Sequence, residues 1–359
     1  MTTPTELDRH QPEGLGSAGA PGPHAKRRLP GPARSVLRVH RTGLLIWASF
    51  LSALAGGLVW LYFTGQQAER FDSDVCLARG HEPGVPRCAD ADGLSAPEFY
   101  STLLELAQTM ITYLPFAVAA YVGGALVARD FERGTAALAW TQSVTPARWL
   151  ASKLAVPGLL IVGATAVLIV LQRWVWRSGP QDPVRFWWEQ DAFHAGGPVG
   201  LAFAVLGLAT GALAAVLTRR VLPTMGLSFA ALAAAHAALG SFRDQLWPKV
   251  RVTGTEATGL TDREAEKFDA GMITESGTRA GTFCDGKQSS EALRQCLAEH
   301  DALGVFAVIH PESHFWPLQL VETGVVLALA AALTAAAFRL LRSSSGPQST
   351  PAAGLETPA

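Results

Sequence analysis

The chain has 359 residues, of which 49% are hydrophobic and only 16% are charged, against about 25% charged residues in ordinary soluble domains. This apolar content excludes a chain that is disordered throughout. Its 29 basic and 30 acidic residues nearly cancel, which argues against a nucleic-acid-binding protein, so no nucleic-acid partner is expected.

The apolar residues are concentrated in six segments that each contain at most one charged side chain. Each segment has at least the roughly 18 residues that a helix needs to span the hydrocarbon of a bilayer. A helix is the expected form, because it satisfies its own backbone hydrogen bonds in lipid. The sequence therefore predicts an all-α integral membrane protein with six transmembrane helices, at about 43–63, 109–128, 154–171, 200–217, 222–240 and 320–338.

Basic residues form four clusters at the ends of these segments, and with six spans all four clusters fall on the same side of the membrane. They precede the first span, fill the segment between spans two and three, occupy the short turn Arg219–Arg220, and follow span six at Arg339 and Arg342. The positive-inside rule places these clusters in the cytoplasm. We expect a protein of the plasma membrane with both termini cytoplasmic and a large outer loop, 241–315, between helices five and six.

The two ends of the chain are rich in proline, glycine and small polar residues. Residues 1–32 and 343–359 are predicted to be disordered cytoplasmic tails, which leaves 33–342 as the membrane domain. Residues 33–42 fit either a basic helix on the inner leaflet or a segment that only supplies positive charge.

All four cysteines fall in the predicted outer loops, at Cys76, Cys88, Cys284 and Cys296. Disulfides persist in such an oxidising compartment. The short spacing favours Cys76 with Cys88 and Cys284 with Cys296, although four cysteines allow three connectivities. A zinc site and free thiols are the alternatives; zinc fits poorly, because both pairs are spaced Cys-x11-Cys and the chain has no Cys-x-x-Cys motif.

The cytoplasmic segment between spans two and three, 129–153, contains residues that typically mark a bend and the starts of two helices. Gly134 permits a sharp bend, and Thr135 is a suitable N-cap for a short helix over 136–142. Thr145 and Pro146 suit the start of the next helix. The short helix is expected to display Leu138, Trp140, Thr141 and Gln142 to a membrane surface or a docking protein.

Several residues of this segment form a signature: Glu132, Gly134, Thr135, Ala139–Thr145, Arg148, Trp149 and Lys153. The signature resembles that of permease subunits of type 2 ATP-binding-cassette (ABC) exporters, in the form abundant in actinobacteria. Leu114–Pro115 and the stretch 315–322 resemble the same family, and Asp130 and Pro146 depart from its usual pattern. The resemblance implies a six-span permease domain, a coupling helix that docks on a separate ABC ATPase subunit, and a permease dimer, most simply a homodimer, in membrane lipid.

The chain lacks its own ATPase motifs. Residues 281–288 (GTFCDGKQ) come near a phosphate-binding loop, but Gln288 replaces the hydroxyl residue that would bind Mg²⁺. We therefore expect no catalytic residues, no enzyme activity and no cofactor in this chain. His310, Glu312 and His314 suit a wet polar rim better than a metal site, because Pro311 breaks the helix that the spacing needs.

Polar residues near the outer ends of spans two and six are informative in a membrane protein. Glu105, Gln108, Gln319 and Glu322 either line an outer vestibule or mark helix ends that reach headgroups and water. His236 in span five suits a hydrogen-bonded packing residue. Gly56 with Gly57, Gly123 with Gly124, and Gly207 with Gly211 fit close helix packing.

These observations predict a membrane-spanning permease subunit of an ATP-driven ABC exporter. A separate nucleotide-binding subunit would hydrolyse ATP, and the segment 129–153 would couple that hydrolysis to substrate movement across the membrane. The alternative is a non-transporting membrane signalling or interaction protein that keeps the permease fold.

Overall fold

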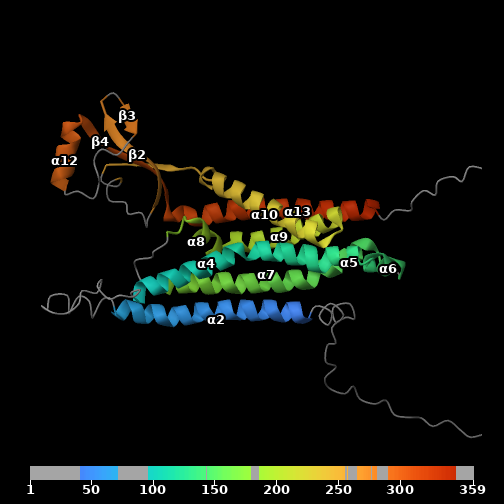
Figure 1. Ribbon diagram of the computed structural model, residues 1–359. Helices are drawn as coiled ribbons and strands as arrows, with labels where there is room; N and C mark the ends of the chain where they lie inside the picture. Colours follow the sequence, from blue (N-terminus) through green and yellow to red (C-terminus); the bar gives the residue numbers. More distant parts are fainter. Residues whose placement is uncertain are drawn as a thin grey trace, which may run out of the picture.

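The computed structural model describes residues 41–71, 96–142, 144–178, 186–254, 257, 265–275, 277–280 and 290–344. Within this part of the chain, six helices are long and apolar enough to cross a membrane (Figure 1). They confirm the predicted six-span helical membrane architecture. The spans are built from α2 (Arg41–Phe71), α4 (Ala96–Ala120), α7 (Pro146–Ser178), α9 (Pro198–Thr218), α10 (Val221–Phe242) and α13 (Phe315–Ser344).

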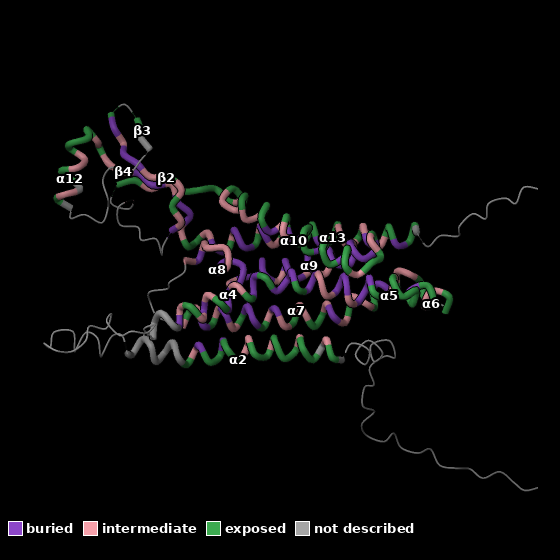
Figure 2. The backbone as a smooth tube through the Cα atoms, viewed as in Figure 1, coloured by how far each residue is buried: buried purple, intermediate pink, exposed green. Residues whose placement is uncertain are grey.

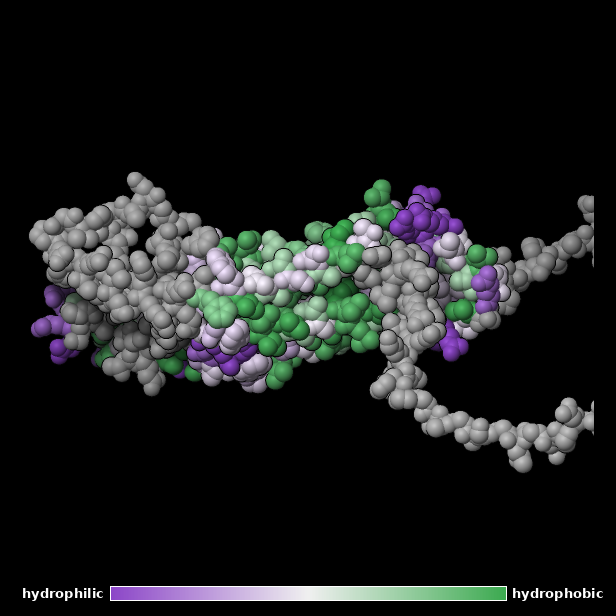
Figure 3. All heavy atoms as spheres, turned by 90° about the horizontal axis from the view of Figure 1, so that it is seen from below, coloured by the Kyte–Doolittle hydropathy of each residue, from purple (hydrophilic) through white to green (hydrophobic). Residues whose placement is uncertain are grey.

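Helix α9 is the core of the bundle. Of its span, 78% is buried, against 11% for α2 and 22% for each of α7, α10 and α13 (Figure 2). Its alanines and glycines let the neighbouring backbones approach closely. The second span, Tyr100–Glu132, is also 67% buried. The other four helices therefore cover these two and expose apolar side chains outward, which Figure 3 shows over the middle of the bundle.

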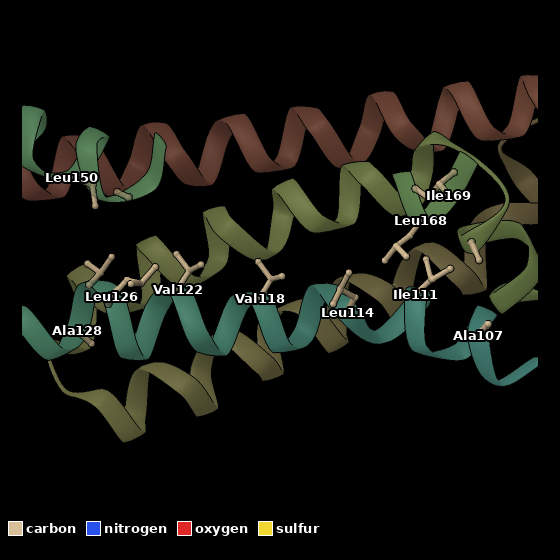
Figure 4. Close-up of a cluster of buried hydrophobic side chains, with 14 of the residues drawn as sticks. Ala107, Ile111, Leu114, Val118, Val122, Leu126, Ala128, Leu150, Leu168 and Ile169 are labelled. Carbon is tan, nitrogen blue, oxygen red and sulfur yellow. The ribbon is translucent and has the colours of Figure 1, made fainter. Parts of the chain in front are cut away.

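The largest apolar cluster joins α4 to its neighbours. Ile111, Leu114, Val118 and Val122 recur three or four residues apart, so they form one face of the helix (Figure 4). Leu168 of α7 belongs to the same cluster. The second span is apolar on all sides, but this spacing gives it one face that packs against the neighbouring helices.

The second span changes its helical pitch towards its end. After Pro115 inside α4, the chain forms the π-helix η2 (Tyr121–Ala128) and then α5 (Arg129–Glu132). A Cβ atom on Gly123 of η2 would lie 2.7 Å from the carbonyl oxygen of Gly211 on α9. One on Gly207 would lie 2.6 Å from the Pro115 carbonyl oxygen. The predicted close packing at these glycines is confirmed, and it lies inside the chain. For Gly56 and Gly57 of α2 the prediction was wrong, because no described atom lies within 4 Å of a Cβ added there.

The loop between helices five and six is long enough for an ordered cap, and it contains a small domain whose strands the sequence did not predict. Strands β1 (Val250–Thr253), β2 (Ala265–Thr274), β3 (Gly277–Ala280) and β4 (Ala302–Pro311) form an antiparallel sheet in the order β1-β4-β2-β3. Helix α12 (Ser290–Glu299) lies against β4. Ala265, Ala307 and Ile309 form its small core. We call the sheet and α12 the cap.

The two ends of the bundle differ in kind. The cap and the short helix α8 (Gln190–Ala195) lie at one end, which we call the cap end, and α5 and α6 (Thr135–Thr141) lie at the other (Figure 1). The first residue of α2 and the last of α13 lie at the α6 end. The tail 1–32 and residues 345–359 fall outside the described residues, as do Gly281–Gln288, whereas α13 continues to Ser344, past the predicted boundary at 342.

Candidate functional site

The segment between the second and third spans folds as a tight helical hairpin. Arg133 and Gly134 form the turn after α5, and Gly134 has a φ of +72°, a conformation that glycine adopts without strain. Helix α6 runs over Thr135–Thr141. The predicted N-cap was wrong by one residue: Gly134 is the cap, and Thr135 is the first helical residue, whose Oγ1 donates to the Asp130 carbonyl oxygen at 3.2 Å.

A charge pair closes the base of this hairpin. Lys153 Nζ on α7 lies 2.7 Å from Asp130 Oδ2, and both side chains are mostly shielded from solvent. Helix α7 begins at Pro146 as predicted, with the backbone N–H of Arg148 donating to Thr145 Oγ1 at 3.4 Å. The two ends of the segment are therefore held together.

Three aromatic rings fix α6 to the bundle. Phe131, Trp140 and Trp149 pack edge-to-face, with centroid distances of 6.1 Å, 5.4 Å and 5.9 Å around the triangle. Trp149 is buried and Trp140 is half-buried. The prediction that α6 displays Trp140 was therefore wrong, because its indole turns back onto Phe131 and Trp149. We call these three residues the aromatic triangle.

A further contact ties the segment to the start of α10. Glu132 Oε2 accepts a hydrogen bond from the backbone N–H of Val221 at 3.2 Å. The Arg219 guanidinium lies 5.8 Å from the Phe131 ring centroid, within range of a cation–π contact. The hairpin thus touches the α9–α10 turn as well as its own two spans.

The outer face of α6 is open. Leu138 is 60% exposed, and Thr135, Ala137, Thr141 and Gln142 are exposed beside it. An exposed leucine on a rigidly held helix, outside the apolar band of the bundle, is suited to docking. The arrangement can pass a push on α6 to α7 through the aromatic triangle and to α10 through Glu132.

A family model described as ABC-2 membrane transporter related matches residues 51–243. The chain belongs to this family. The match covers more than half of the 359 residues, includes the whole hairpin and ends before the cap. This ABC-2-related chain is thus the permease subunit type of an ABC transporter, not the ATPase, and a multi-pass membrane protein. Comparison with curated proteins and with solved structures found no match.

At the cap end, the permease holds a buried polar network. Glu322 Oε2 of α13 accepts from Arg243 Nε at 3.0 Å, and Glu322 Oε1 lies 3.3 Å from His194 Nε2 of α8. His194 Nδ1 lies 3.1 Å from His236 Nε2, and Gln190 Nε2 lies 2.8 Å from His236 Nδ1. The predicted packing role of His236 therefore has defined partners. We call these five residues the cap-end network.

Burial lowers the pKa of His194 below its ordinary value, although the hydrogen bond that His194 donates to Glu322 acts in the opposite direction. The nearby Arg243 also lowers this pKa. A neutral His194 that donates from Nε2 to Glu322 Oε1 accepts at Nδ1 from the Nε2–H of His236, and His236 Nδ1 then accepts from the Gln190 amide.

The predicted outer vestibule was wrong for most of its residues. Gln319 and Glu322 are fully buried. The Gln319 amide joins α8 to α9, because it donates to the Phe193 carbonyl oxygen of α8 at 2.6 Å and accepts from the Val199 N–H of α9 at 3.1 Å. Gln108 is also fully buried on α4, and Glu105 is half-buried. Two of the four residues thus hold α8 in place, because α8 returns into the bundle where we expected open water.

His310 is likewise buried, with Nδ1 2.9 Å from His314 Nδ1 and Nε2 3.1 Å from the Asp244 carbonyl oxygen. It is a buried residue of strand β4 in the cap and is not part of a wet rim. Among the described residues, no group of three or more His, Cys, Asp or Glu could hold a metal ion.

Of the cysteines, Cys296 on α12 is described and is not a free thiol. Cys76, Cys88 and Cys284 lie outside the described residues, so the two pairs stay predictions.

Sequence reasoning missed Arg243, His194 and Gln190. The only sequence feature that points to them is that they are polar residues near the ends of predicted spans. Such residues are common at any membrane surface, so this feature does not identify a network. Only the folded chain shows that α8 brings His194 and Gln190 to the ends of α10 and α13.

Proposed function

We propose that this permease subunit serves an ATP-driven exporter and that α6 is the helix on which a separate ABC ATPase docks. The observation that carries the proposal is the contrast within α6. Its inner face is fixed by the aromatic triangle, while Leu138 and its neighbours are exposed. A helix that transmits movement from a docked ATPase to the spans needs both a rigid attachment to those spans and an exposed face for the ATPase.

The transmitted motion would follow the contacts of the hairpin. Movement of α6 displaces Trp149 at the start of α7, and the Lys153–Asp130 pair makes α5 move with it. The Glu132–Val221 hydrogen bond carries the same movement to α10. Three of the six spans thus respond to one docking surface.

We infer that the transport path lies between two copies of this permease. Helix α9 fills the centre of the bundle with 78% of its span buried, so one chain has packed side chains where a central path would run. The outer helices expose apolar surface that can pack against a second copy or against lipid. A homodimer with two ATPase subunits is the simplest assembly.

For the orientation, we propose the plasma membrane with the α6 end in the cytoplasm, where ATP is available. The α6 end holds Arg129, Arg133, Arg148, Arg219 and Arg220, as the positive-inside rule requires of the cytoplasmic face. The cap then faces outward with its cysteines, and transport runs towards the cap.

The test is co-purification from native membranes with a single-residue change. Leu138→Glu places a charge on the exposed face of α6. Leu303→Glu is the matched control, because Leu303 is 70% exposed on β4 at the opposite end. We expect an ABC ATPase to co-purify with the native chain and with Leu303→Glu, but to be lost with Leu138→Glu.

Two outcomes would contradict the proposal. If the ATPase is retained by Leu138→Glu, docking lies elsewhere. If no ATPase accompanies the native chain in gentle detergent, a non-transporting receptor that keeps the permease fold becomes the better explanation.

A further inference from the structure

A cavity of about 220 Å³ opens at the cap end of the bundle, between α7, α8 and the start of α13. It is separate from the coupling hairpin and from the cap-end network. Residues from three parts of the chain line it: the last turns of α7, Trp187 together with Ala192 of α8, and the first turn of α13.

The cavity carries a net positive charge. Arg173 and Arg177 line it from α7, and Glu312 is the single acidic residue in its wall. Four residues apart on a helix, the two arginines share one face. Neither arginine forms an ion pair within the described part of the chain. An anion is therefore the ligand that this wall favours.

Arg173 is held in position without using most of its donors. Its guanidinium lies 4.9 Å from the Phe315 ring centroid and 4.6 Å from that of Trp316, and Nη1 donates to the Gly196 carbonyl oxygen at 3.0 Å. A guanidinium has five N–H donors. The planar group is thus preorganised, with donors left over, which suits it to phosphate or carboxylate.

Two buried groups of the wall have polar atoms without a hydrogen-bond partner among the described residues. They are Gln172, whose amide nitrogen and oxygen are both unpartnered, and Trp187, whose indole N–H is unpartnered. Gln172 is only 1% exposed. Because leaving a buried donor unpaired costs about 1–3 kcal/mol, two such residues on one small cavity indicate a missing ligand.

The position of the cavity relative to the bilayer indicates where the ligand comes from. Helix α7 has 33 residues and is about 50 Å long, which exceeds the ~30 Å of hydrocarbon. Its last turns therefore reach headgroup level. Trp174 and Trp316 beside the cavity are 42% and 46% exposed, and such rings favour the same level.

The volume sets the size of the ligand. About 220 Å³ is below the ~300–1,000 Å³ of pockets that enclose a whole small molecule. A phosphate headgroup fits this limit, while its acyl chains would stay outside against the apolar faces of α7 and α13.

We propose that this cavity binds the phosphate headgroup of an anionic phospholipid in the leaflet at the cap end. Arg173 and Arg177 neutralise the phosphate, and the Trp187 indole and the Gln172 amide donate to its oxygens. The Gln172 carbonyl oxygen accepts from a headgroup hydroxyl. This site does not depend on the exporter proposal, because it requires neither the ATPase nor transport.

The test measures lipid binding to the full-length purified chain by native mass spectrometry and by thermal shift. The probes are phosphatidylglycerol, phosphatidylcholine with the same acyl chains, and soluble glycerol phosphate. We expect one tightly retained phosphatidylglycerol that raises the thermal midpoint, with weaker retention of phosphatidylcholine and no comparable effect of glycerol phosphate.

Arg177→Gln is the main variant, because Arg177 is exposed and its loss should leave the fold intact. Arg339→Gln removes the same charge from an exposed position at the opposite end of α13 and is the matched control. We expect Arg177→Gln to weaken phosphatidylglycerol binding about tenfold, the effect of losing one charge-assisted contact, and Arg339→Gln to change it less than about twofold.

Gln172→Leu separates a ligand site from a simple packing defect. Under the proposal, it weakens phosphatidylglycerol binding and reduces the lipid-induced thermal shift. If the cavity holds only water, the same change raises the thermal midpoint equally in every lipid.

That last result would overturn the proposal. So would equal weakening by Arg177→Gln and Arg339→Gln, which indicates diffuse surface attraction. Equal binding of phosphatidylcholine, or protection by glycerol phosphate as strong as that by the lipid, would also overturn it.

Discussion

Gly123 and Gly211 meet backbone to backbone at the centre of the membrane domain, where a Cβ on Gly123 would lie 2.7 Å from the Gly211 carbonyl oxygen. Gly123 sits in the π-helix η2, and such π-segments are often found at functional sites. Because η2 leads directly into α5 and the coupling hairpin, this contact fixes the second span against α9 just where that span leaves the bundle.

The first prediction concerns this contact. Gly123→Ala or Gly211→Ala should destabilise the protein by about 1–3 kcal/mol, the cost of forcing an extra methyl group into a packed interior. Gly56→Ala is the control, because no described atom lies within 4 Å of its added Cβ. Thermal unfolding in detergent measures the difference. Similar midpoints for all three variants would contradict the described packing of η2 on α9.

The aromatic triangle gives a prediction about coupling. Trp140→Phe should preserve the contacts with Phe131 and Trp149, since the Trp140 indole N–H has no described partner that would be lost. Trp140→Ala removes two ring contacts and should cost about 2 kcal/mol or more. In reconstituted transporter, Trp140→Ala should keep bound ATPase but lose most substrate-stimulated ATP hydrolysis. Unchanged stimulation would show that α6 does not act through this triangle.

The pair of Glu322 and Arg243 gives a prediction about the cap end. Glu322 is 0% exposed and the Arg243 side chain 12% exposed, so Glu322→Gln leaves a largely buried guanidinium without its carboxylate. Loss of one partner of a buried ion pair costs about 3–5 kcal/mol. Replacing both residues by methionine should be less harmful than either single change, because no unpaired charge is left behind. A double-mutant cycle of thermal stability measures this coupling, and additive effects would contradict it.

His194 gives a prediction about pH. Burial lowers its pKa in the native protein, while the unfolded chain keeps a value of about 6.5. As the pH falls through about 6.5, the unfolded state therefore takes up a proton that native His194 resists. Stability should fall with decreasing pH in this range and level off below the native pKa. His194→Gln should flatten the pH profile of the thermal midpoint, and an identical slope in the variant would assign the effect to other groups.

The sequence predicted the six spans because the apolar segments are long and almost free of charge, yet it underestimated their lengths. Helix α4 begins at Ala96, well before the predicted 109, and the span predicted from 154 is only part of α7, whose start at Pro146 was predicted separately from the Thr145–Pro146 pair. Their end turns carry charged residues, since these turns lie outside the hydrocarbon, and a search for uncharged segments stops too early.

The cap and the cap-end network were beyond the reach of the sequence for a different reason. Strand β1 pairs with β4, for example Val250 with Ile309, across some 60 residues of chain. The network joins α8, α10, η3 (Arg243–Gln245) and α13. Local patterns report on hydrogen bonds within one element, but they carry no information on which distant elements meet.

The last prediction concerns the cysteines of the cap. Cys284 and Cys296 are expected to pair, as are Cys76 and Cys88, if the cap faces an oxidising compartment. Alkylation of the unreduced protein should then label no thiol, and labelling after reduction should reach all four cysteines. Mass spectrometry of proteolytic fragments identifies the pairs.

Cys284→Ser combined with Cys296→Ser should destabilise the cap by about 2–4 kcal/mol, the usual contribution of a disulfide. Hydrogen exchange should rise in β2, β4 and α12, while the helices around α9 keep their protection, because the disulfide closes a loop of the cap alone. Alkylation of Cys296 before reduction would contradict the pairing. It would also remove the main chemical argument for placing the cap outside the cell, which would then rest on the arginines at the α6 end.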